Sequence, residues 1–322
     1  MISLPLVGDH PDDLDALYSI ATSQPQVSVD EWRIARRRGL GGSDAPVVLG
    51  LSPWKAALTL WGEKTGRLAE PVLDSDAVEM GKVLEPAILE RYRQKTGRAA
   101  RPWPATLIVQ HADVEFLRAT PDGLTFDNDL GLGLVQLKST GEFTGREWDD
   151  GPPVHVEAQV QHELAATGAR WGSIVVLIGG RRLKWFDVKP NDEFVGIMLE
   201  REAEFWQHVV EDRQPEVSEH DARVGGRDLG RTLAALYGRD MGDAVALPDE
   251  GVEVDRRLRE IKAEQKQLET EREALETRLK GWIGSASVGV LPNGRSYSWK
   301  SFERAGYVVE PTSGRMLRAL GK

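Results

Sequence analysis

The sequence contains no cysteine, and this absence excludes disulfides, thiolate metal sites and cysteine nucleophiles together. It also lacks long apolar runs: the longest, around residues 173–178, is far below the roughly 20 residues of a membrane-spanning helix. The first residues include Asp9, Asp12 and Asp13, with no basic segment before an apolar stretch. We therefore expect a cytoplasmic protein with no membrane anchor and no signal peptide.

Basic residues are fewer than acidic ones, with 41 Lys and Arg against 51 Asp and Glu and a formal net charge of -10. A surface that binds nucleic acid normally needs Lys and Arg, because these displace counterions from the phosphates. Either nucleic acid is not the partner, or the basic groups are concentrated in one channel. The cluster of Arg33, Arg36, Arg37 and Arg38 favours concentration, whereas a solvated helix end explains it equally well.

Apolar periodicity predicts an α/β fold. Helical patterns cover 29–38, 56–66, 75–96, 154–167 and 193–210, and strand patterns cover 107–109, 116–120, 133–137, 172–178 and 183–188. The order is helices, strands, one helix, two strands and a helix. This order is typical of a mixed central sheet flanked by helices.

The predicted domain organisation has three parts. Residues 1–28 form an N-terminal lead-in, 29–215 the α/β core and 216–322 a C-terminal extension. Within the extension, 217–251 shows little pattern, and 252–282 predicts a long charged helix with apolar residues near a heptad spacing. We interpret this helix as an arm or a short coiled coil. A hairpin over 287–300 follows, because Asn293-Gly294 is a strong turn signal.

Two short motifs carry the candidate chemistry: Thr120-Pro121-Asp122-Gly123 and Val135-Gln136-Leu137-Lys138. Side chains alternate along a strand, so Gln136 and Lys138 project to one side. Asp122, brought alongside by a hairpin, would complete an oxygen site for Mg²⁺ or Mn²⁺ with Gln136 and the Leu137 carbonyl. Lys138 would orient a water nucleophile or stabilise charge on a phosphate. Each motif alone also fits an ordinary hairpin.

Two helical residues add to these motifs. Glu85 lies among Val83, Leu84, Ala87 and Ile88, which predict a packed helix face, and a carboxylate near such a face needs a partner or a metal ion. Gln159, on the helix over 154–167, could donate a hydrogen bond to a phosphate. The alternatives are an exposed glutamate and a solvated polar face.

Five motifs occur in a familiar order: Arg36 to Asp44, Gly81 with Glu85, Thr120 to Gly123, Gln136 to Lys138, and Gln159 to Gln161. Together they resemble the YqaJ-type viral recombinases, relatives of phage lambda exonuclease in the PD-(D/E)XK nuclease superfamily. The resemblance covers roughly residues 29–212. It implies a restriction-endonuclease-like fold, which agrees with the mixed sheet expected from periodicity.

The resemblance also implies roles for individual residues. The metal site would consist of Glu85, Asp122, Gln136 and the backbone carbonyl of Leu137. Lys138 would be the catalytic lysine. A pocket for the 5′-phosphate of a DNA end would be formed by Arg36, Ser43, Thr120 and Gln159, with Trp32 near the bound DNA.

The activity implied is a Mg²⁺-dependent 5′–3′ exonuclease that acts on double-stranded DNA ends and leaves 3′ single-stranded tails for an annealing protein. The family also implies a ring-shaped trimer, and a ring with a basic interior would reconcile DNA binding with the acidic total charge. Three alternatives remain: an endonuclease on the same core, a catalytically weakened DNA-end-binding protein, and an interaction protein that acts through the helix over 252–282.

Gln136 departs from the family pattern, which has glutamate at this position. A neutral amide oxygen should bind a hard divalent cation more weakly than a carboxylate does. Gln136 is then a tolerated ligand, a substitution made to trap a complex, or a sign that cleavage was lost and binding kept. We expect some activity, and we expect Gln136→Glu to preserve or raise Mg²⁺-dependent cleavage.

Overall fold

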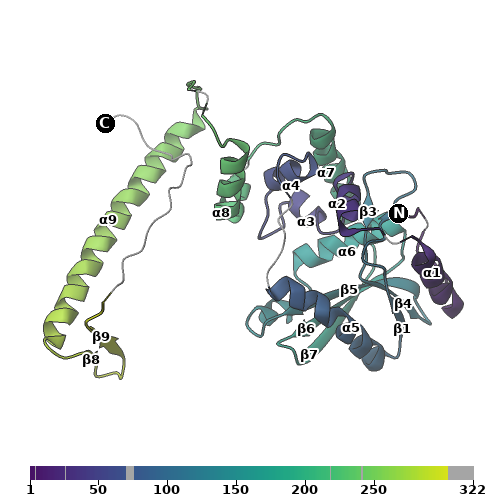
Figure 1. Ribbon diagram of the computed structural model, residues 1–322, viewed down its shortest axis with the longest axis horizontal. Helices are drawn as coiled ribbons and strands as arrows, with labels where there is room; N and C mark the ends of the chain where they lie inside the picture. The colour runs from purple at the N-terminus through teal and green to yellow at the C-terminus, as the bar shows by residue number, and fades with distance from the viewer. Residues whose placement is uncertain (4, 26, 70–75, 218, 241, 304–322) are drawn as a thin grey trace. The chain divides into compact units, whose positions relative to one another are not determined.

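The computed structural model describes the chain except residues 4, 26, 70–75, 218, 241 and 304–322 (Figure 1). The chain divides into two compact units, Met1–Gly238 and Arg239–Lys322. The residues of the candidate site lie in the first unit.

A five-stranded sheet forms the centre of the first unit, with strand order β1-β4-β5-β6-β7. Its strands are β1 (Ala99–Pro102), β4 (Gly123–Asp127), β5 (Gly131–Thr140), β6 (Gly172–Ile178) and β7 (Arg182–Val188). The pair β5–β6 is parallel and the other pairs are antiparallel. The predicted mixed sheet is therefore confirmed.

Helices cover both faces of this sheet (Figure 1). On one face, α5 (Asp76–Thr96) packs Ile88 and its neighbours against Val135 and Leu137 of β5. On the other, α1 (Pro11–Ser23) and α6 (Val154–Thr167) pack against Leu134 and the alternate residues of β5 and β6. Because side chains alternate along β5, Gln136 and Lys138 belong to the face that α6 covers.

The first unit contains further helices and a small sheet. They are α2 (Val29–Arg37), α3 (Ala45–Val48), α4 (Ala57–Lys64), a 3-10 helix (Thr144–Trp148), α7 (Asp192–Val210), α8 (Glu219–Leu236) and the small sheet of β2 (Val109–Gln110) and β3 (Arg118–Ala119). Of these, α3, α7 and the small sheet contact α6, whereas α8 packs against α4. A second apolar cluster joins Leu60 of α4, Phe205 of α7 and Leu229 of α8. The weak sequence pattern over 217–251 thus contains a helix, which packs through Leu229, Leu233 and Leu236.

One expectation about α5 was wrong. Val83 is 64% exposed and Ala87 is also exposed, although their spacing indicated a packed face. The packed residues are Ile88, Leu89 and Tyr92, with Leu84 partly buried. The packed side of α5 therefore includes Leu84 and Ile88 of the expected face but neither Val83 nor Ala87.

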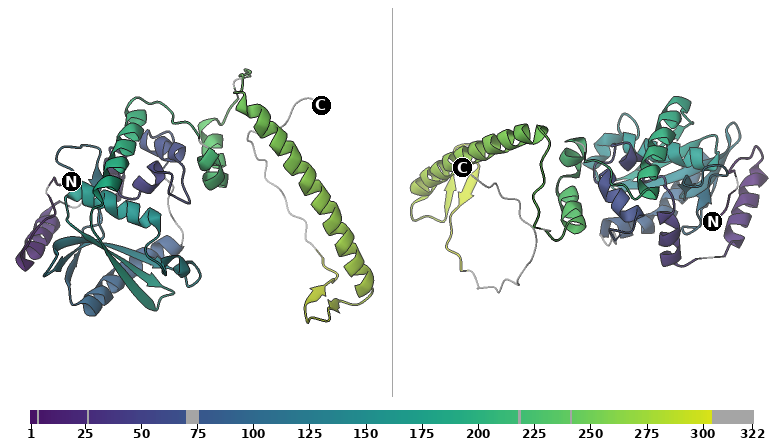
Figure 2. Two further views of the ribbon diagram at one scale, coloured as in Figure 1. Left: turned by 180° about the vertical axis from the view of Figure 1, so that it is seen from behind. Right: turned by 90° about the horizontal axis from the view of Figure 1, so that it is seen from above.

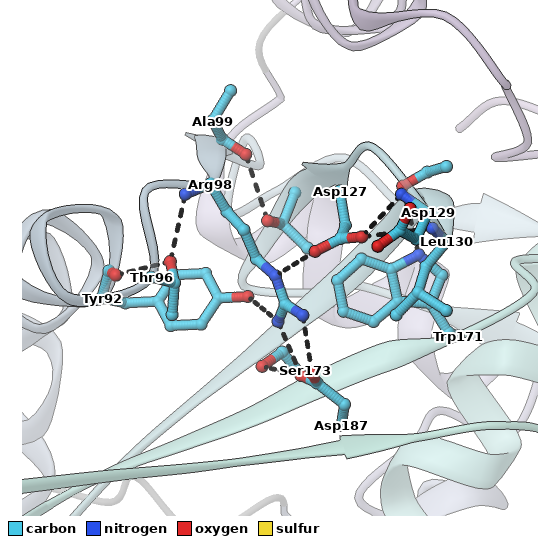
Figure 3. Close-up of polar contacts among 12 residues, drawn as sticks. Tyr92, Thr96, Arg98, Ala99, Asp127, Asp129, Leu130, Trp171, Ser173 and Asp187 are labelled. Atoms are coloured by element: carbon cyan, nitrogen blue, oxygen red, sulfur yellow. Dashed lines mark hydrogen bonds and ion pairs between the residues drawn. The ribbon is translucent and has the colours of Figure 1, made fainter.

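Arg98, which precedes β1, connects distant parts of the first unit (Figure 3). Its Nε donates to Asp127 Oδ2 at 2.7 Å, and its two Nη atoms donate to the two oxygens of Asp187 at 2.8 and 2.7 Å. Tyr92 Oη also accepts from Arg98 at 3.1 Å, and the guanidinium lies 4.8 Å from the ring centroid of Trp171. These hydrogen bonds, first those to Asp187, raise the pKa of Arg98, so its guanidinium stays positively charged.

The second unit contains α9 (Glu250–Ile283) and the hairpin of β8 (Val288–Val290) and β9 (Ser296–Ser298), visible in both views of Figure 2. None of the residues of α9 is buried. Pairs three or four residues apart, such as Arg259 with Asp255 and Arg272 with Glu276, stabilise its surface. Among the described residues of both units, no helix is long and apolar enough to cross a membrane.

Candidate functional site

The β4–β5 hairpin brings Asp122 beside residues 136–138 of β5. Gly123 pairs with Val135 in the antiparallel register, so Asp122, one residue before β4, comes opposite Gln136. The backbone N–H of Leu137 donates to Asp122 Oδ2 at 2.7 Å. The expected meeting of Asp122 with the segment Gln136–Lys138 is thus present.

A chain of hydrogen bonds leads from β5 to α6. Lys138 Nζ donates to Gln159 Oε1 at 3.0 Å, and Gln159 Nε2 donates to Glu163 Oε1 at 2.9 Å. Sequence reasoning did not single out Glu163. Its position four residues after Gln159 could have indicated it, since such residues share a helix face.

Glu85 of α5 faces the same group. Burial raises the pKa of Glu85, and the charge of Asp122 raises it further, while Lys82 and Lys138 oppose this. Burial likewise raises the pKa of Asp122, against the effect of Lys138 and of the Leu137 N–H. Two half-buried carboxylates therefore lie near enough to repel each other, an arrangement that a cation would relieve.

Gln136 is the member of this group whose side-chain oxygen has no partner among the described residues. It is only 5% exposed, and its Oε1 has no hydrogen-bond partner in the described part of the chain. A buried acceptor left without a partner costs about 1–3 kcal/mol. A group from outside the described chain, such as a cation or its bound water, would remove this cost.

The donor set fits a hard divalent cation only in part. It offers the carboxylates of Glu85 and Asp122, the Gln136 amide oxygen and the Leu137 carbonyl, all of them oxygens as Mg²⁺ and Mn²⁺ prefer. However, no three His, Cys, Asp or Glu side chains among the described residues are grouped so that they could hold a metal ion. The site is therefore poorer in close carboxylates than a dedicated metal cage.

The predicted phosphate pocket is partly assembled around α2. Arg36 Nη2 donates to Ser43 Oγ at 3.1 Å, and the Arg36 guanidinium lies 4.9 Å from the ring centroid of Trp32. Thr120 lies two residues before Asp122, and no hydrogen bond of its side chain is present among the described residues. Gln159 already uses its amide toward Lys138 and Glu163, so its predicted contact with a phosphate would need a rearrangement or its remaining hydrogen.

Asp44 holds the loop that carries Ser43. Its Oδ2 accepts from the Gly41 N–H at 2.9 Å and from Lys64 Nζ at 2.6 Å. Burial opposes ionisation of Asp44, but Lys64 and Arg36 outweigh it and lower its pKa to about 2. This buried ion pair fixes the position of the loop.

The loop also touches the α6 side of the site. A Cβ atom on Gly42 would come within 2.5 Å of Glu163 Oε1, so the loop can approach Glu163 only because residue 42 is glycine. The loop carrying Ser43 and the group of Asp122, Lys138 and Gln159 are therefore parts of one continuous site.

Residues 31–170 match the family model of the YqaJ-like viral recombinase domain. The matched range contains every residue of the site, from Trp32 to Glu163. The resemblance drawn from the five motifs is thereby confirmed.

Individual relatives extend this match. The chain is 28% identical to the protein YqaJ of Bacillus subtilis (strain 168) over 285 residues, which is 87% of this chain and 86% of that protein. The crystal structure of the alkaline exonuclease LHK-Exo from Laribacter hongkongensis is 21% identical, covers 63% of this chain and 97% of its own, and has a TM-score of 0.46. A phage-related exonuclease from Haemophilus somnus 129PT is 10% identical, with coverages of 54% and 96% and a TM-score of 0.41.

Proposed function

We propose that the protein is a divalent-metal-dependent exonuclease that digests double-stranded DNA from its ends in the 5′–3′ direction. The observation that carries the proposal is the convergence of Glu85, Asp122, Gln136 and Lys138 beside a loop that positions an arginine and a serine. The match to the YqaJ-like viral recombinase domain supports the same class of activity.

The acidic part of the site would hold the cation. Mg²⁺ or Mn²⁺ bound by Glu85, Asp122, Gln136 and the Leu137 carbonyl would stabilise charge on the scissile phosphate and acidify a water molecule. Asp122 is held for this role by the Leu137 N–H. The raised pKa values of Glu85 and Asp122 mean that both carboxylates would gain from a positive charge between them.

Lys138 would act on the nucleophile and on the phosphate. Its ammonium group is positioned by Gln159, so it keeps two hydrogens for a water molecule or a phosphate oxygen. A fixed positive charge beside the scissile bond stabilises the negative charge that develops as the water attacks.

Arg36 and Ser43 would recognise the end of the DNA. A guanidinium binds phosphate with two parallel hydrogen bonds, and among the described residues only Ser43 accepts a hydrogen bond from that of Arg36. Recognition of a terminal 5′-phosphate would set the direction of digestion and leave a 3′ single strand. An annealing protein would be the partner that takes up this strand, and a ring of three copies is the assembly that we propose from the family resemblance.

Digestion of linear duplex DNA labelled at either the 5′ or the 3′ terminus tests this proposal, first with Mg²⁺ and then with Mn²⁺. We expect the 5′ label to be released early as mononucleotide, while the 3′ label stays on a shortening fragment. Early release of the 3′ label would contradict the proposed direction. Absence of any nucleotide release would contradict the proposed activity.

Gln136 favours one second candidate, a DNA-end-binding protein with weakened cleavage. Its neutral side chain leaves the site with fewer negative charges for a cation. This candidate predicts that labelled duplex ends are bound in Mg²⁺ or Mn²⁺ without release of nucleotides, and that Gln136→Glu restores release.

A further inference from the structure

Glu163 is a buried carboxylate that the proposed mechanism does not use. It is 2% exposed and lies on α6, on the side of the sheet to which Gln136 and Lys138 belong. Its Oε1 accepts from Gln159, whereas its Oε2 has no hydrogen-bond partner in the described part of the chain. No cation of the described chain forms an ion pair with it, so a buried group that is costly to ionise is left half satisfied.

The surroundings of Glu163 are those of the candidate site. The charge of Asp122 acts on Glu163, as does that of Lys138, and Gln159 bridges Lys138 and Glu163. Burial, and then the charge of Asp122, raise the pKa of Glu163 to about 7. The loop approaches Glu163 through Gly42. A carboxylate with purely structural use would instead be closed by a cation, as Asp44 is by Lys64.

Glu163 and Gln136 each contribute one buried oxygen without a hydrogen-bond partner in the described part of the chain. The oxygen of Gln136 is neutral, whereas that of Glu163 carries negative charge when the carboxyl group is ionised. We propose that Glu163 supplies the negative charge that Gln136 lacks, so that the metal site takes its third carboxylate from α6 and not from β5. This inference rests on the proposed function and specifies how the site of that function is built.

The separation of the carboxylates determines how Glu163 would act. No three of them are grouped closely enough to hold one ion directly. Glu163 would therefore act on a hydrated ion, with its free Oε2 accepting a hydrogen bond from a metal-bound water. This suits Mg²⁺, which usually keeps several of its water molecules in proteins.

Mn²⁺ binding to the full chain without DNA, measured by electron paramagnetic resonance or calorimetry, tests the proposal. In Glu163→Gln the charge is lost, while the amide oxygen can still accept from Gln159. We expect the Mn²⁺ dissociation constant to rise at least about tenfold, the equivalent of 1.4 kcal/mol at this ratio. Glu157→Gln, an exposed position on the same helix, is the matched control and should leave the constant unchanged.

Rescue distinguishes a shared cation from a general effect of charge or folding. Adding Gln136→Glu to Glu163→Gln should return Mn²⁺ affinity to within about threefold of the original protein. Thermal unfolding in EDTA reports whether each variant is folded, and Glu163→Asp, which keeps the charge, should bind Mn²⁺ more tightly than Glu163→Gln does.

The Mn²⁺ dissociation constants of these variants decide the role of Glu163. An unchanged dissociation constant in Glu163→Gln would overturn the role of Glu163, and so would a weakened variant that Gln136→Glu fails to rescue. If the original protein binds no Mn²⁺ at all, the metal dependence in the proposed function fails as well, which separates the two failures. Should Glu163→Gln not fold, the comparison of Glu163→Asp with the original protein decides, and a loss of more than tenfold there would contradict the proposal.

Discussion

The Arg98 network and the candidate site are both clusters of at least partly buried charged groups, but they differ in whether their polar atoms have partners. Around Arg98, one guanidinium donates hydrogen bonds to Asp127 and Asp187, and Ser173 Oγ donates to Asp187 at 2.9 Å (Figure 3). In the candidate site, Gln136 Oε1 and Glu163 Oε2 are left without partners in the described part of the chain.

This difference separates structural from functional use of charge. A buried network whose members satisfy one another stabilises the arrangement of strands and needs nothing from outside. A cluster that holds Asp122 and Glu163 near each other with their pKa values raised is costly by itself. Such a cost is expected where a ligand completes the site.

The largest effect is expected from Lys138→Ala, which removes the cation of the open cluster. We expect DNA cleavage to fall by about 10²–10³-fold, as on removal of other groups that stabilise developing charge, with little change in the urea midpoint. Initial rates of nucleotide release measure this, with Lys95→Ala, exposed on α5, as the control. Full activity of Lys138→Ala would remove Lys138 from the catalytic machinery.

Arg98→Ala should show the converse pattern. Removing the guanidinium leaves the partly exposed carboxylates of Asp127 and Asp187 without their cation, so we expect the free energy of unfolding to fall by about 1.5–3 kcal/mol. Cleavage per folded molecule at low temperature should be retained. Arg67→Ala breaks the exposed pair with Asp212 and should cost at most about 1 kcal/mol. Equal losses in these two variants, measured by urea unfolding, would contradict the distinction.

His162, directly before Glu163 in the sequence, forms a buried pair with Glu202, whose Oε2 has no hydrogen-bond partner in the described part of the chain. Its Nδ1 lies 2.7 Å from Glu202 Oε1 and its Nε2 lies 2.8 Å from the Arg118 carbonyl. Burial opposes protonation of His162, but Glu202 outweighs it and raises the pKa to about 9. The folded pKa exceeds the unfolded value of about 6.5, so this stabilisation is complete below pH 6.5 and is lost as pH rises through 9.

Urea unfolding at pH 6, 7.5 and 9.5 measures this loss, which we expect to be on the order of 2–3 kcal/mol. His162→Gln, which does not titrate, is the comparison, because other groups also titrate in this range. A stability that declines in parallel in both proteins would show that His162 is not the protonated partner of Glu202.

The smallest effect concerns Arg36, whose guanidinium has open donors where that of Arg98 is fully engaged. Arg36→Ala should slow digestion of 5′-phosphorylated ends at least about tenfold more than that of unphosphorylated ends, since hydrogen bonds to charged groups contribute roughly 1.5–3 kcal/mol. Arg33→Ala, also on α2 and near Asp30, is the control. An equal loss on both kinds of end would argue against a phosphate pocket at Arg36.

Much of the fold could be predicted because local patterns and tertiary packing agree. The strands β6 and β7 are joined by Gly179 and Gly180, whose φ angles are 58° and 70°, and α6 ends at Gly168 with φ 70°. Alternation along β5 also placed Gln136 and Lys138 on one face. These features depend on neighbours in the sequence.

Other features depend on contacts between residues far apart in the sequence, and local sequence patterns do not predict such contacts. Val83 and Ala87 have the spacing of a packed face, yet both are exposed. The helix α8 packs through Leu229, Leu233 and Leu236, which the sequence pattern over 217–251 did not indicate. Glu163 lies on a helix buried on most sides, so no amphipathic pattern distinguishes its direction, and its closeness to Asp122 arises only when α6 folds over β5.

Digestion of one plasmid, supplied either closed or linearised, tests the central claim most directly, because the two substrates differ only in having ends. With Mg²⁺, the purified full chain should degrade the linear form and leave the closed form intact, and EDTA should abolish degradation. Loss of the closed form at the same rate would contradict an exonuclease. Survival of the linear form in both Mg²⁺ and Mn²⁺ would contradict a nuclease of any kind.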